Sequence, residues 1–541
     1  MPLGRQFAAE LGSALRLRRM EAGVQMLTSA AAEIERLGAA SPNAASLLLL
    51  IAQWVDVGYR DHRLLDTLLS RFPAGCRKKL PVDDYLRMRM VDGFRHFTTG
   101  ELDAAIDTLD LVLKTCSDIP DTSLAAWAHF WKGRAHRKKG EYEASLKDIV
   151  QAREMAQADH DDMFTSVIQI QESWLLFQKG MSRDALQILD RAESVLKSTD
   201  HYVALGNIES ARGRIIRRSG EYTKALEHFA RAIEMYARQD PNHVNLARTL
   251  VNAAYVRRLL ALQLRKRIDT RVQSGRLRSR PSPEQPAVTR DNPLTRYQCV
   301  WQEALEDLTR AREIYALHAH FDGIGKVVLN LGYLHLDRGD VERAWEEAIE
   351  AYRVGLEQND HILMARARIL QAAIENAHVE EQMGEDVDNA VHANRALQYS
   401  EEALSLAHGT QNRRLLAGAC IARGMTAAND FFQEWETARR YATEATGLIG
   451  PGENDHLVED LTKLKSRVVQ ASGINDTLRG WSEGIVGNKT FQQITEEFAE
   501  IVIPKVWIRE DRKVSRVATS LSISPKKVRR ILRNSGLVER Q

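Results

Sequence analysis

The sequence has few of the features that mark membrane, secreted or metal-binding proteins. Its longest apolar run, ASLLLLIAQWV at 45–55, is shorter than the ~20 residues that span a bilayer. Charges interrupt each apolar stretch of the first twenty residues, unlike in a secretory signal peptide. We therefore expect a soluble, cytoplasmic protein that has no membrane partner.

Cysteine, proline and aromatic residues are also scarce. The four cysteines lie far apart and show no metal-ligand spacing, which favours small buried hydrophobes in a reducing compartment. Prolines number 13 and aromatic residues make up 6% of the 541 positions, whereas Ala, Leu, Arg and Glu are abundant. This composition predicts a helix-rich chain.

The motifs of common enzyme classes are missing. The sequence contains no G-x-x-x-x-G-K-[ST], H-E-x-x-H, Cys-x-x-Cys or G-x-S-x-G pattern. The acidic stretch ADHDD at 158–162 falls between two predicted helices, where such residues cap helix ends. We expect a protein that is not an enzyme and that holds no cofactor and no metal.

What the sequence does contain is a repeat. Glycines recur at 100, 140, 180 and 220, a spacing of 40 each time, and Gly339 has similar surroundings. Around Gly220, a small residue (Gly213) comes seven positions earlier, and apolar residues follow five, nine and twelve positions later. This pattern predicts a helix that ends at glycine, followed by a second helix with one apolar face. Because such a hairpin cannot bury that face alone, copies must stack on it.

The best copies are LNLGYLHLDRGDVERA from Leu329 and GRAHRKKGEYEAS from Gly133. They resemble the tetratricopeptide repeat, which has Gly and Tyr in its first helix and Gly-x-Tyr-x-x-Ala opening the second. The resemblance covers most of residues 43–450, with a period nearer 40 than the usual ~34. It implies an all-α solenoid of helical hairpins, wound as a right-handed superhelix whose concave groove binds a protein or peptide.

The resemblance also implies groove residues. Aligning VNAAY, LNLGY and LQAAI places Asn252, Asn330 and Gln371 at equivalent positions, which face the groove in tetratricopeptide proteins. A side-chain amide offers the donor and acceptor that an extended peptide backbone requires. Alternatively, these amides contact neighbouring helices or water. Arg366 and Arg368 offer a further partner for a carboxylate or phosphate.

Composition shifts divide the chain. We predict capping helices at 1–42, the solenoid at 43–472, a linker at 473–490 and a separate module at 491–541. The segment at 269–293 is basic, rich in proline and almost free of apolar residues, which favours a disordered insert in one repeat. Its basic start, at 265–280, leaves an RNA-binding adaptor as a third interpretation of the chain.

The last module has the pattern of two helices joined by a tight turn. Ala518 is small enough for close helix packing, and a turn falls at Ser522. Ser524 is placed to cap a helix that begins at Pro525. In that helix apolar residues are expected inside and basic residues outside, respectively Val528, Ile531 and Leu532, and Lys526, Lys527, Arg529, Arg530 and Arg533.

This module resembles the C-terminal helix-turn-helix of the Fis type, which reads A-x-x-L-x-I-S and closes with G-L. The matching residues are Ala518, Leu521, Ile523, Ser524, Gly536 and Leu537. The sequence departs from the pattern at Ser522, where glycine is usual, and at Pro504 in the preceding helix. The resemblance implies binding to double-stranded DNA, as a homodimer on a two-fold site. We expect Ser524, Lys526, Lys527 and Arg530 to contact base edges, and Lys513, Arg516, Arg529 and Arg533 to contact phosphates.

Charge is concentrated in this module. Residues 505–541 carry 11 Lys and Arg against 3 Asp and Glu, a net charge of +8. Because the whole chain has a net charge of +2, residues 1–504 carry a net charge of −6. This distribution favours phosphate contact by the module alone. We expect a bacterial-type transcription regulator whose solenoid binds a partner and whose helix-turn-helix engages DNA. The alternative is a non-catalytic interaction scaffold whose basic tail docks onto a partner.

Overall fold

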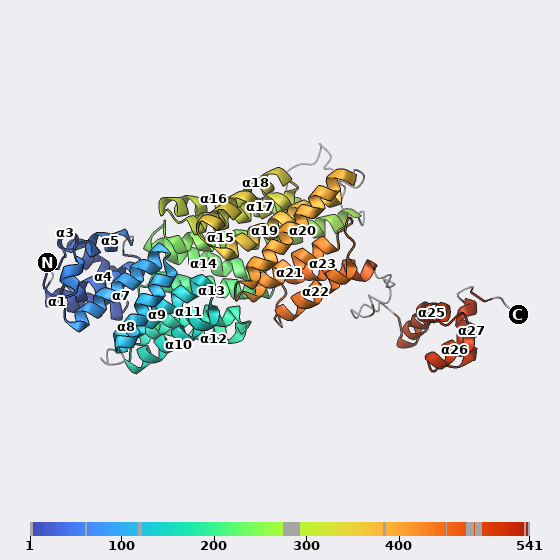
Figure 1. The fold of residues 1–541 in the computed structure, drawn as a ribbon, viewed down its shortest axis with the longest axis horizontal. Helices are drawn as coiled ribbons and strands as arrows, with labels where there is room; N and C mark the ends of the chain where they lie inside the picture. Colours follow the sequence, from blue (N-terminus) through green and yellow to red (C-terminus); the bar gives the residue numbers. More distant parts are fainter. Residues whose placement is uncertain are drawn as a thin grey trace. The chain divides into compact units, whose positions relative to one another are not determined.

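The computed structural model describes residues 4–39, 41–59, 62–116, 122–273, 293–381, 386–450, 452–471, 481, 489–534 and 537–538. Within these ranges every regular element is a helix (Figure 1). The chain forms two compact units, Met1–Leu461 (unit 1) and Thr462–Gln541 (unit 2). No described helix is long and apolar enough to cross a membrane.

Unit 1 begins with six helices of unequal length. They are α1 (Arg5–Arg16), α2 (Met20–Ser29), α3 (Ala31–Ile34), α4 (Ala44–Asp56), α5 (Arg63–Leu69) and α6 (Ala74–Arg77). The carboxylate of Asp200, far along the chain, accepts hydrogen bonds from the backbone N–H groups of Met20 (2.7 Å) and Glu21 (2.8 Å). Because these N–H groups have no partner inside α2, Asp200 caps the helix and attaches the start of the chain to the later repeats.

Antiparallel helix pairs follow in order along unit 1. The pairs are α7 (Val82–Thr99) with α8 (Leu102–Cys116), α9 (Thr122–Lys139) with α10 (Tyr142–Ala158), α11 (Asp162–Gln178) with α12 (Ser182–Leu196), α13 (Tyr202–Arg218) with α14 (Tyr222–Gln239), α15 (Val244–Gln273) with α16 (Pro293–Leu317), α17 (Phe321–Arg338) with α18 (Val341–Glu357), α19 (His361–Glu381) with α20 (Asp386–His408), and α21 (Arg413–Ala427) with α22 (Trp435–Leu448). The next helix, α23 (His456–Ala471), crosses the boundary between the units.

The repeated glycines end the first helix of their pairs. Their φ angles are +86° at Gly100, +84° at Gly140, +87° at Gly180, +82° at Gly220 and +82° at Gly339. This left-handed region is costly for residues with a Cβ atom, so glycine is favoured wherever the hairpin must turn this way. The conformation of the turn is thus the physical reason that glycine recurs at these positions.

The small residues seven positions earlier allow the two helices of a pair to approach closely. A Cβ atom at Gly133 would lie 2.9 Å from the Ile149 side chain, and one at Gly213 would lie 2.6 Å from the Phe229 ring. Ile149 and Phe229 come sixteen positions after these glycines and are buried. The same spacing therefore places a large side chain of the second helix against a glycine of the first.

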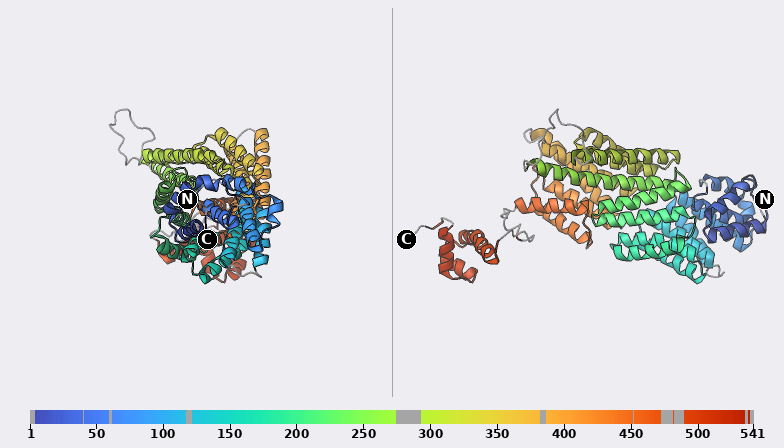
Figure 2. Two further views of the ribbon diagram at one scale, coloured as in Figure 1. Left: turned by 90° about the vertical axis from the view of Figure 1, so that its left-hand side faces the viewer. Right: turned by 180° about the vertical axis from the view of Figure 1, so that it is seen from behind.

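The superhelix of unit 1 returns on itself, so that distant repeats touch. The backbone N–H of Glu143 donates to the side-chain carbonyl of Gln411 (3.1 Å), and the N–H of Asn454 donates to the carbonyl of Arg218 (2.7 Å). These contacts join the start of α10 and the end of α13 to the segments before α21 and α23. The end-on view in Figure 2 shows the helices arranged around a common interior.

Unit 2 contains α25 (Phe491–Arg509), α26 (Val514–Ser520) and α27 (Pro525–Asn534). Its core is formed by Ile503, Val506, Val517, Ala518, Val528, Ile531 and Leu532. Ser522 adopts the left-handed conformation that the turn requires, with φ +50°. Pro504 lies within α25. The start of α27, its inward apolar residues and the close packing of Ala518 agree with the sequence pattern.

Two predicted segments fall largely outside the described residues. The expected insert at 269–293 begins within α15, which continues to Gln273, and ends where α16 begins at Pro293. Residues 274–292 are not described. Of the expected linker at 473–490, only 481, 489 and 490 are described. Gly536 of the predicted helix-turn-helix also lies outside the described residues.

Candidate functional site

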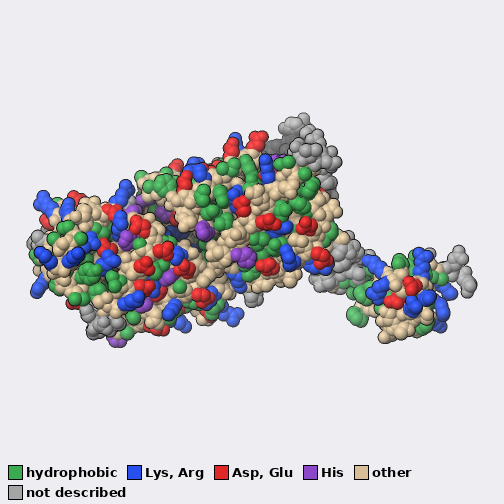
Figure 3. Space-filling model, in the orientation of Figure 1, with side chains coloured by type: hydrophobic (Ala, Val, Ile, Leu, Met, Phe, Trp, Pro, Cys, Tyr) green, Lys and Arg blue, Asp and Glu red, His purple; other side chains and the backbone are tan. Residues whose placement is uncertain are grey.

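The first helices of successive pairs bring basic side chains into the interior of unit 1. We define the basic interior as Arg137 and Lys138 of α9, Arg214 and Arg217 of α13, Arg248 of α15, Lys326 of α17 and Arg366 of α19. Lys138, Arg248 and Arg366 are accessible to solvent, and the other four are partly buried. In the space-filling view, unit 1 is hollowed near its middle, with histidines close to the opening (Figure 3).

The repeat itself sets the positions of two of these residues. Arg137 and Arg217 each lie three positions before a hairpin glycine, Gly140 and Gly220. In the neighbouring repeats this position holds phenylalanine, which is buried at Phe177 and Phe97. Two pairs of the array therefore place a cation where the adjacent pairs place an aromatic ring.

The cations of α9, α13 and α15 lie close enough to repel one another. Burial, followed by the charges of Arg248, Arg134 and Arg214, lowers the pKa of Arg137 to about 9. Burial and the charge of Arg248 lower the pKa of Arg214 to about 10. Residues on three separate helices thus contribute to one positively charged region.

The basic interior extends to α17. Desolvation inside the array lowers the pKa of Lys138 to about 8, the carboxylate of Asp322 opposes this shift, and the charge of Lys326 adds to it. The same cations act on a neighbouring imidazole, because burial and then Arg248 and Lys326 lower the pKa of His320 to about 3. The imidazole of His320 is therefore neutral at physiological pH. Its Nδ1 accepts a hydrogen bond from the backbone N–H of Gly323 (3.0 Å) and caps α17.

Toward α19 the basic interior continues through Arg217 and Arg366. Burial lowers the pKa of Arg217. The nearby Tyr255 and Asp455 oppose this shift, whereas the charges of Arg414 and Arg366 add to it. The Arg217 guanidinium lies over the Tyr255 ring, 4.8 Å from its centroid. This stacking covers one face of the guanidinium but supplies no counter-charge.

Within the described part of the chain, none of the seven side chains of the basic interior forms an ion pair. Neighbouring arginines do. Arg258 donates to Asp337 (3.0 Å), and Arg212 contacts Asp190 (2.6 Å), Glu193 (2.7 Å) and Glu209 (2.8 Å). Unpaired cations that are partly buried and lie near one another are costly in a folded protein, which marks the basic interior as a candidate anion site.

The three side-chain amides predicted for the groove have two different kinds of surroundings. Asn252 and Asn330 lie one helical turn after Arg248 and Lys326, and each Nδ2 donates to the backbone carbonyl of that residue, at 2.8 and 2.7 Å. Their side-chain oxygens have no hydrogen-bond partner among the described residues. Gln371 is 3% exposed, and its Oε1 accepts from Arg368 (2.8 Å).

Arg368 has an ion-pair partner and two ring contacts, whereas Arg366 forms no ion pair among the described residues. The Arg368 guanidinium is bonded to Glu402 (2.6 Å) and lies over the rings of Tyr352 (3.7 Å) and Tyr399 (4.8 Å). Arg368 and Gln371 thus form an internal polar cluster. Of the two arginines that the sequence suggested for this helix, Arg366 alone belongs to the basic interior.

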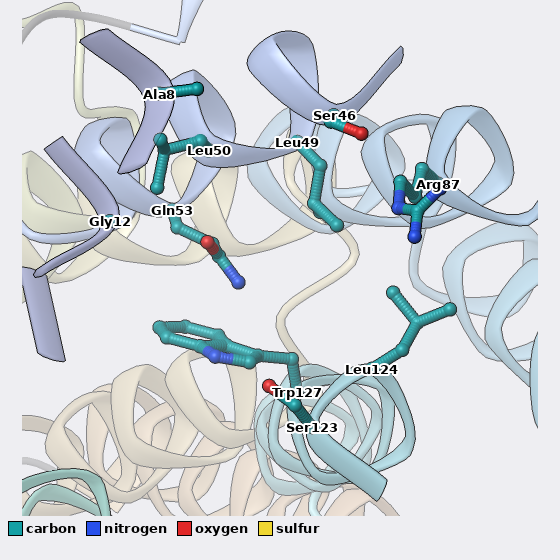
Figure 4. Close-up of a pocket in the computed structure, with 10 residues that line it drawn as sticks. All are labelled: Ala8, Gly12, Ser46, Leu49, Leu50, Gln53, Arg87, Ser123, Leu124 and Trp127. Carbon is teal, nitrogen blue, oxygen red and sulfur yellow. The ribbon is translucent and has the colours of Figure 1, made fainter. Parts of the chain in front are cut away.

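A cavity of about 340 Å³ lies between the N-terminal helices and α9. Its lining includes Ala8, Gly12, Ser46, Leu49, Leu50, Gln53, Arg87, Ser123, Leu124 and Trp127. The Trp127 ring lies across the cavity from Gln53, with Arg87 at the edge (Figure 4). Trp127 also stacks on Phe164, with 4.2 Å between ring centroids, so this wall is fixed by packing.

The acidic stretch at 158–162 has the structural role that its position suggested. The carboxylate of Asp161 accepts a hydrogen bond from the backbone N–H of Phe164 (2.9 Å) and caps α11. In the described part of the chain, no three His, Cys, Asp or Glu side chains are grouped as a metal site requires.

The second candidate site is the outer face of α27 in unit 2. Lys526, Arg529, Arg530 and Arg533 are exposed, and Lys527 is half-buried. Ser524 is exposed, and its hydroxyl accepts from the backbone N–H of Lys527 (3.3 Å), which caps the helix. The opposite face of α27 is buried in the core of unit 2, so the basic residues share one side.

Two predicted DNA contacts are engaged in surface ion pairs. Arg530 contacts Glu496 of α25 (2.9 Å), and Arg516 of α26 contacts Asp511 (2.7 Å). Lys513 immediately precedes α26 and is exposed. Because exposed ion pairs contribute only about 0–1 kcal/mol, Arg530 and Arg516 can exchange these partners for others at little cost.

Comparison with known proteins identifies the class of the solenoid. Residues 205–263, which include most of α13, all of α14 and much of α15, match the tetratricopeptide repeat family. No curated protein matches the sequence of this chain. Residues 205–263 are therefore tetratricopeptide-like, and the other helix pairs of unit 1 are also consecutive helical hairpins.

Solved helical proteins show partial similarity at low identity. A Rap protein complexed with competence and sporulation factor has a TM-score of 0.48 and 12% identity, covering 74% of this chain and 98% of that one. The apo quorum sensor NprR from B. thuringiensis has a TM-score of 0.43 and 13% identity, covering 82% and 98%. A human IFIT1 dimer with m7Gppp-AAAA has a TM-score of 0.44 and 13% identity, covering 79% and 86%.

Sequence reasoning missed the basic interior as a whole. One signal was available, because Arg134 and Arg214, and likewise Arg137 and Arg217, are separated by two full repeats. That regularity does not reveal which arginines are neutralised. Arg134 has the same repeat position as Arg214 but pairs with Asp56 (2.6 Å), a residue from α4.

Proposed function

We propose that this chain is a DNA-binding transcription regulator, not an enzyme, in which unit 1 binds a protein or peptide and unit 2 engages DNA. The observation that carries the DNA-binding part is the division of α27 into two faces. Val528 and Leu532 are fully buried, whereas Arg529 and Arg533, one position further along, are exposed. A helix held by its apolar face with basic side chains outward is suited to enter the major groove.

The turn before α27 supports this proposal. The left-handed Ser522 and the buried Ala518 bring α26 and α27 together as a compact pair on α25. This arrangement supports a helix-turn-helix, a motif in which the second helix reads bases and the first crosses the phosphate backbone. On this basis Ser524, Lys526, Lys527 and Arg530 would face bases, and Lys513, Arg516, Arg529 and Arg533 would face phosphates.

The experiment is selection of duplex DNA from a random pool by the full-length protein. The control replaces Lys526, Lys527, Arg529 and Arg530 with Ala, all of which lie outside the core of unit 2. An enriched sequence that is lost in the control supports a sequence-reading regulator. Equal recovery of all sequences, or no recovery, contradicts it.

A scaffold function is the second candidate, and α25 carries the observation that favours it. Phe491 is 85% exposed, Ile508 62% and Phe498 49%. Exposed aromatic and aliphatic side chains on one helix suit protein contact. In the regulator this surface would form the homodimer that reads a two-fold DNA site, and in the scaffold it would dock onto a different protein. Sedimentation of the full-length protein with and without the selected DNA distinguishes the two.

A further inference from the structure

We infer that the basic interior of unit 1 binds an acidic peptide segment, with Arg137, Arg214, Arg248 and Lys326 contacting its carboxylates. This inference rests on the proposed function in one respect, namely that unit 1 binds a peptide. It adds the chemical class of that peptide and the residues that select it.

The first argument is the imbalance of charge. The basic interior holds seven cations without an ion pair in the described part of the chain, and Asp322 is the carboxylate that acts most strongly on Lys138. Elsewhere in unit 1 comparable arginines are neutralised, as Arg258 is by Asp337 and Arg414 by Asp455. The fold pairs arginines such as Arg258 and Arg414 with carboxylates but leaves these seven neighbouring cations without an ion pair among the described residues, which suits an anion from outside.

The second argument is the shape of the charged region. The seven cations come from five first helices, α9, α13, α15, α17 and α19. Arg248 acts on the cations of α9 and α13, and Arg217 links Arg214 to Arg366 of α19, so the charged region is continuous and extends along the array. A compact polyphosphate would suit a single cluster, whereas an extended chain with spaced carboxylates suits cations distributed along several repeats.

The third argument concerns the peptide backbone. Asn252 and Asn330 lie one turn from Arg248 and Lys326, and their amide oxygens have no partner among the described residues. Each helix thus offers an acceptor for a backbone N–H beside a cation for a side-chain carboxylate. Tyr315, Tyr333 and Tyr255 supply further polar atoms among the same cations.

The test uses the full-length protein and dye-labelled peptides of one length. One peptide alternates Glu with Gly, a second replaces every Glu with Gln, and a third replaces every Glu with Lys. Inorganic tripolyphosphate is added as an unlabelled competitor. Fluorescence anisotropy gives the dissociation constants. We expect the dissociation constant of the Glu peptide to be at least about tenfold lower than that of the Gln peptide.

Matched variants locate the site. Arg214→Gln and Arg248→Gln should each weaken binding of the Glu peptide by about tenfold, because each removes a charge-assisted hydrogen bond. Arg212→Gln is the control on the same helix as Arg214, since Arg212 is already paired with Asp190 and Glu193. Arg212→Gln should leave peptide affinity unchanged. Thermal melts report whether each variant is folded, and Arg214→Gln and Arg248→Gln should melt no lower than the unsubstituted protein.

The possible results separate this inference from the proposed function. Equal binding of the Glu and Gln peptides, or tighter binding of the Lys peptide, overturns the acidic preference while leaving peptide binding intact. Competition by tripolyphosphate without binding of the Glu peptide overturns it in favour of a phosphate ligand. Failure of all three peptides to bind overturns the inference together with the peptide part of the proposed function, while DNA selection still tests unit 2.

Discussion

Arg248 of α15 lies close enough to Arg214 of α13 that its charge, added to the effect of burial, lowers the pKa of Arg214 to about 10. The two residues belong to successive hairpins, and neither has an ion-pair partner in the described part of the chain. Two cations held together without a carboxylate cost folding energy. The interior of unit 1 therefore retains a repulsion that a bound anion would relieve.

Paired and unpaired interior arginines should respond oppositely to neutralisation. Arg258→Gln leaves the Asp337 carboxylate without its partner and should lower the free energy of unfolding by about 3 kcal/mol. Arg248→Gln removes a repelling charge and should leave that free energy equal or higher. Urea unfolding followed by circular dichroism measures both. A larger loss for Arg248→Gln than for Arg258→Gln would contradict this account of the interior.

The close approach at Gly213 should not tolerate a methyl group. A Cβ atom there would lie 2.6 Å from the Phe229 ring, so Gly213→Ala should cost about 1–3 kcal/mol in unfolding free energy through overpacking. Gly12→Ala is the control, because Gly12 is helical and a Cβ atom there would meet no neighbouring side chain or helix within 4 Å. Gly12→Ala should raise the free energy of unfolding by about 0.5–1 kcal/mol, because alanine loses less backbone entropy than glycine in a helix. Differential scanning calorimetry compares the two.

Lys138 should give unit 1 a pH-dependent stability. Its pKa in the folded chain is lowered from 10.5 to about 8, so between these values the unfolded chain binds more protons than the folded chain. Stability should therefore rise as the pH increases through this window. The groups that act on Lys138 are Asp322, Lys326, Arg134 and Arg248.

The Lys138→Gln variant tests this assignment. It should show a shallower rise of melting temperature between pH 8 and 10.5, the interval between the folded and unfolded pKa values of the Lys138 ammonium. The slope that remains comes from other groups, including Arg137, whose pKa is lowered to about 9. An unchanged slope in Lys138→Gln would show that Lys138 keeps its ordinary pKa.

The turn of unit 2 should gain stability from glycine. Ser522 has φ +50°, a conformation that costs a residue with a Cβ atom about 1–2 kcal/mol. Ser522→Gly should therefore raise the melting temperature of unit 2 and preserve DNA binding. Hydrogen exchange of the amides of α26 and α27 reports this unit separately from unit 1. Faster exchange in Ser522→Gly would show that the serine hydroxyl stabilises the turn.

The local features of the fold were predictable because short-range spacing determines them. Glycine at 100, 140, 180, 220 and 339 turns each hairpin through a left-handed backbone, and the predicted all-α array of tetratricopeptide-like hairpins is confirmed. In unit 2 the spacing of Val528, Ile531 and Leu532 correctly predicts the buried face of α27. Binding of DNA by that unit stays a prediction.

The interior of unit 1 was not predictable because it depends on contacts between distant repeats. Arg134 and Arg214 are equivalent in the repeat, yet Asp56 from α4 neutralises the first, and the second forms no ion pair among the described residues. Likewise Asp200 caps α2 across 180 positions of sequence. Periodicity shows which side chains face inward, but the winding of the superhelix decides which of them meet.

The most direct test of the regulator is a comparison of two duplexes, the selected sequence and a scrambled version of the same composition. Dissociation constants for the full-length protein are measured over a range of salt concentrations. We predict that the selected duplex binds at least about 10³-fold more tightly. We also predict that Arg530→Ala reduces this ratio more than Arg533→Ala does, because Arg530 would contact a base and Arg533 a phosphate. Equal affinity for both duplexes at every salt concentration would contradict the account and favour the scaffold.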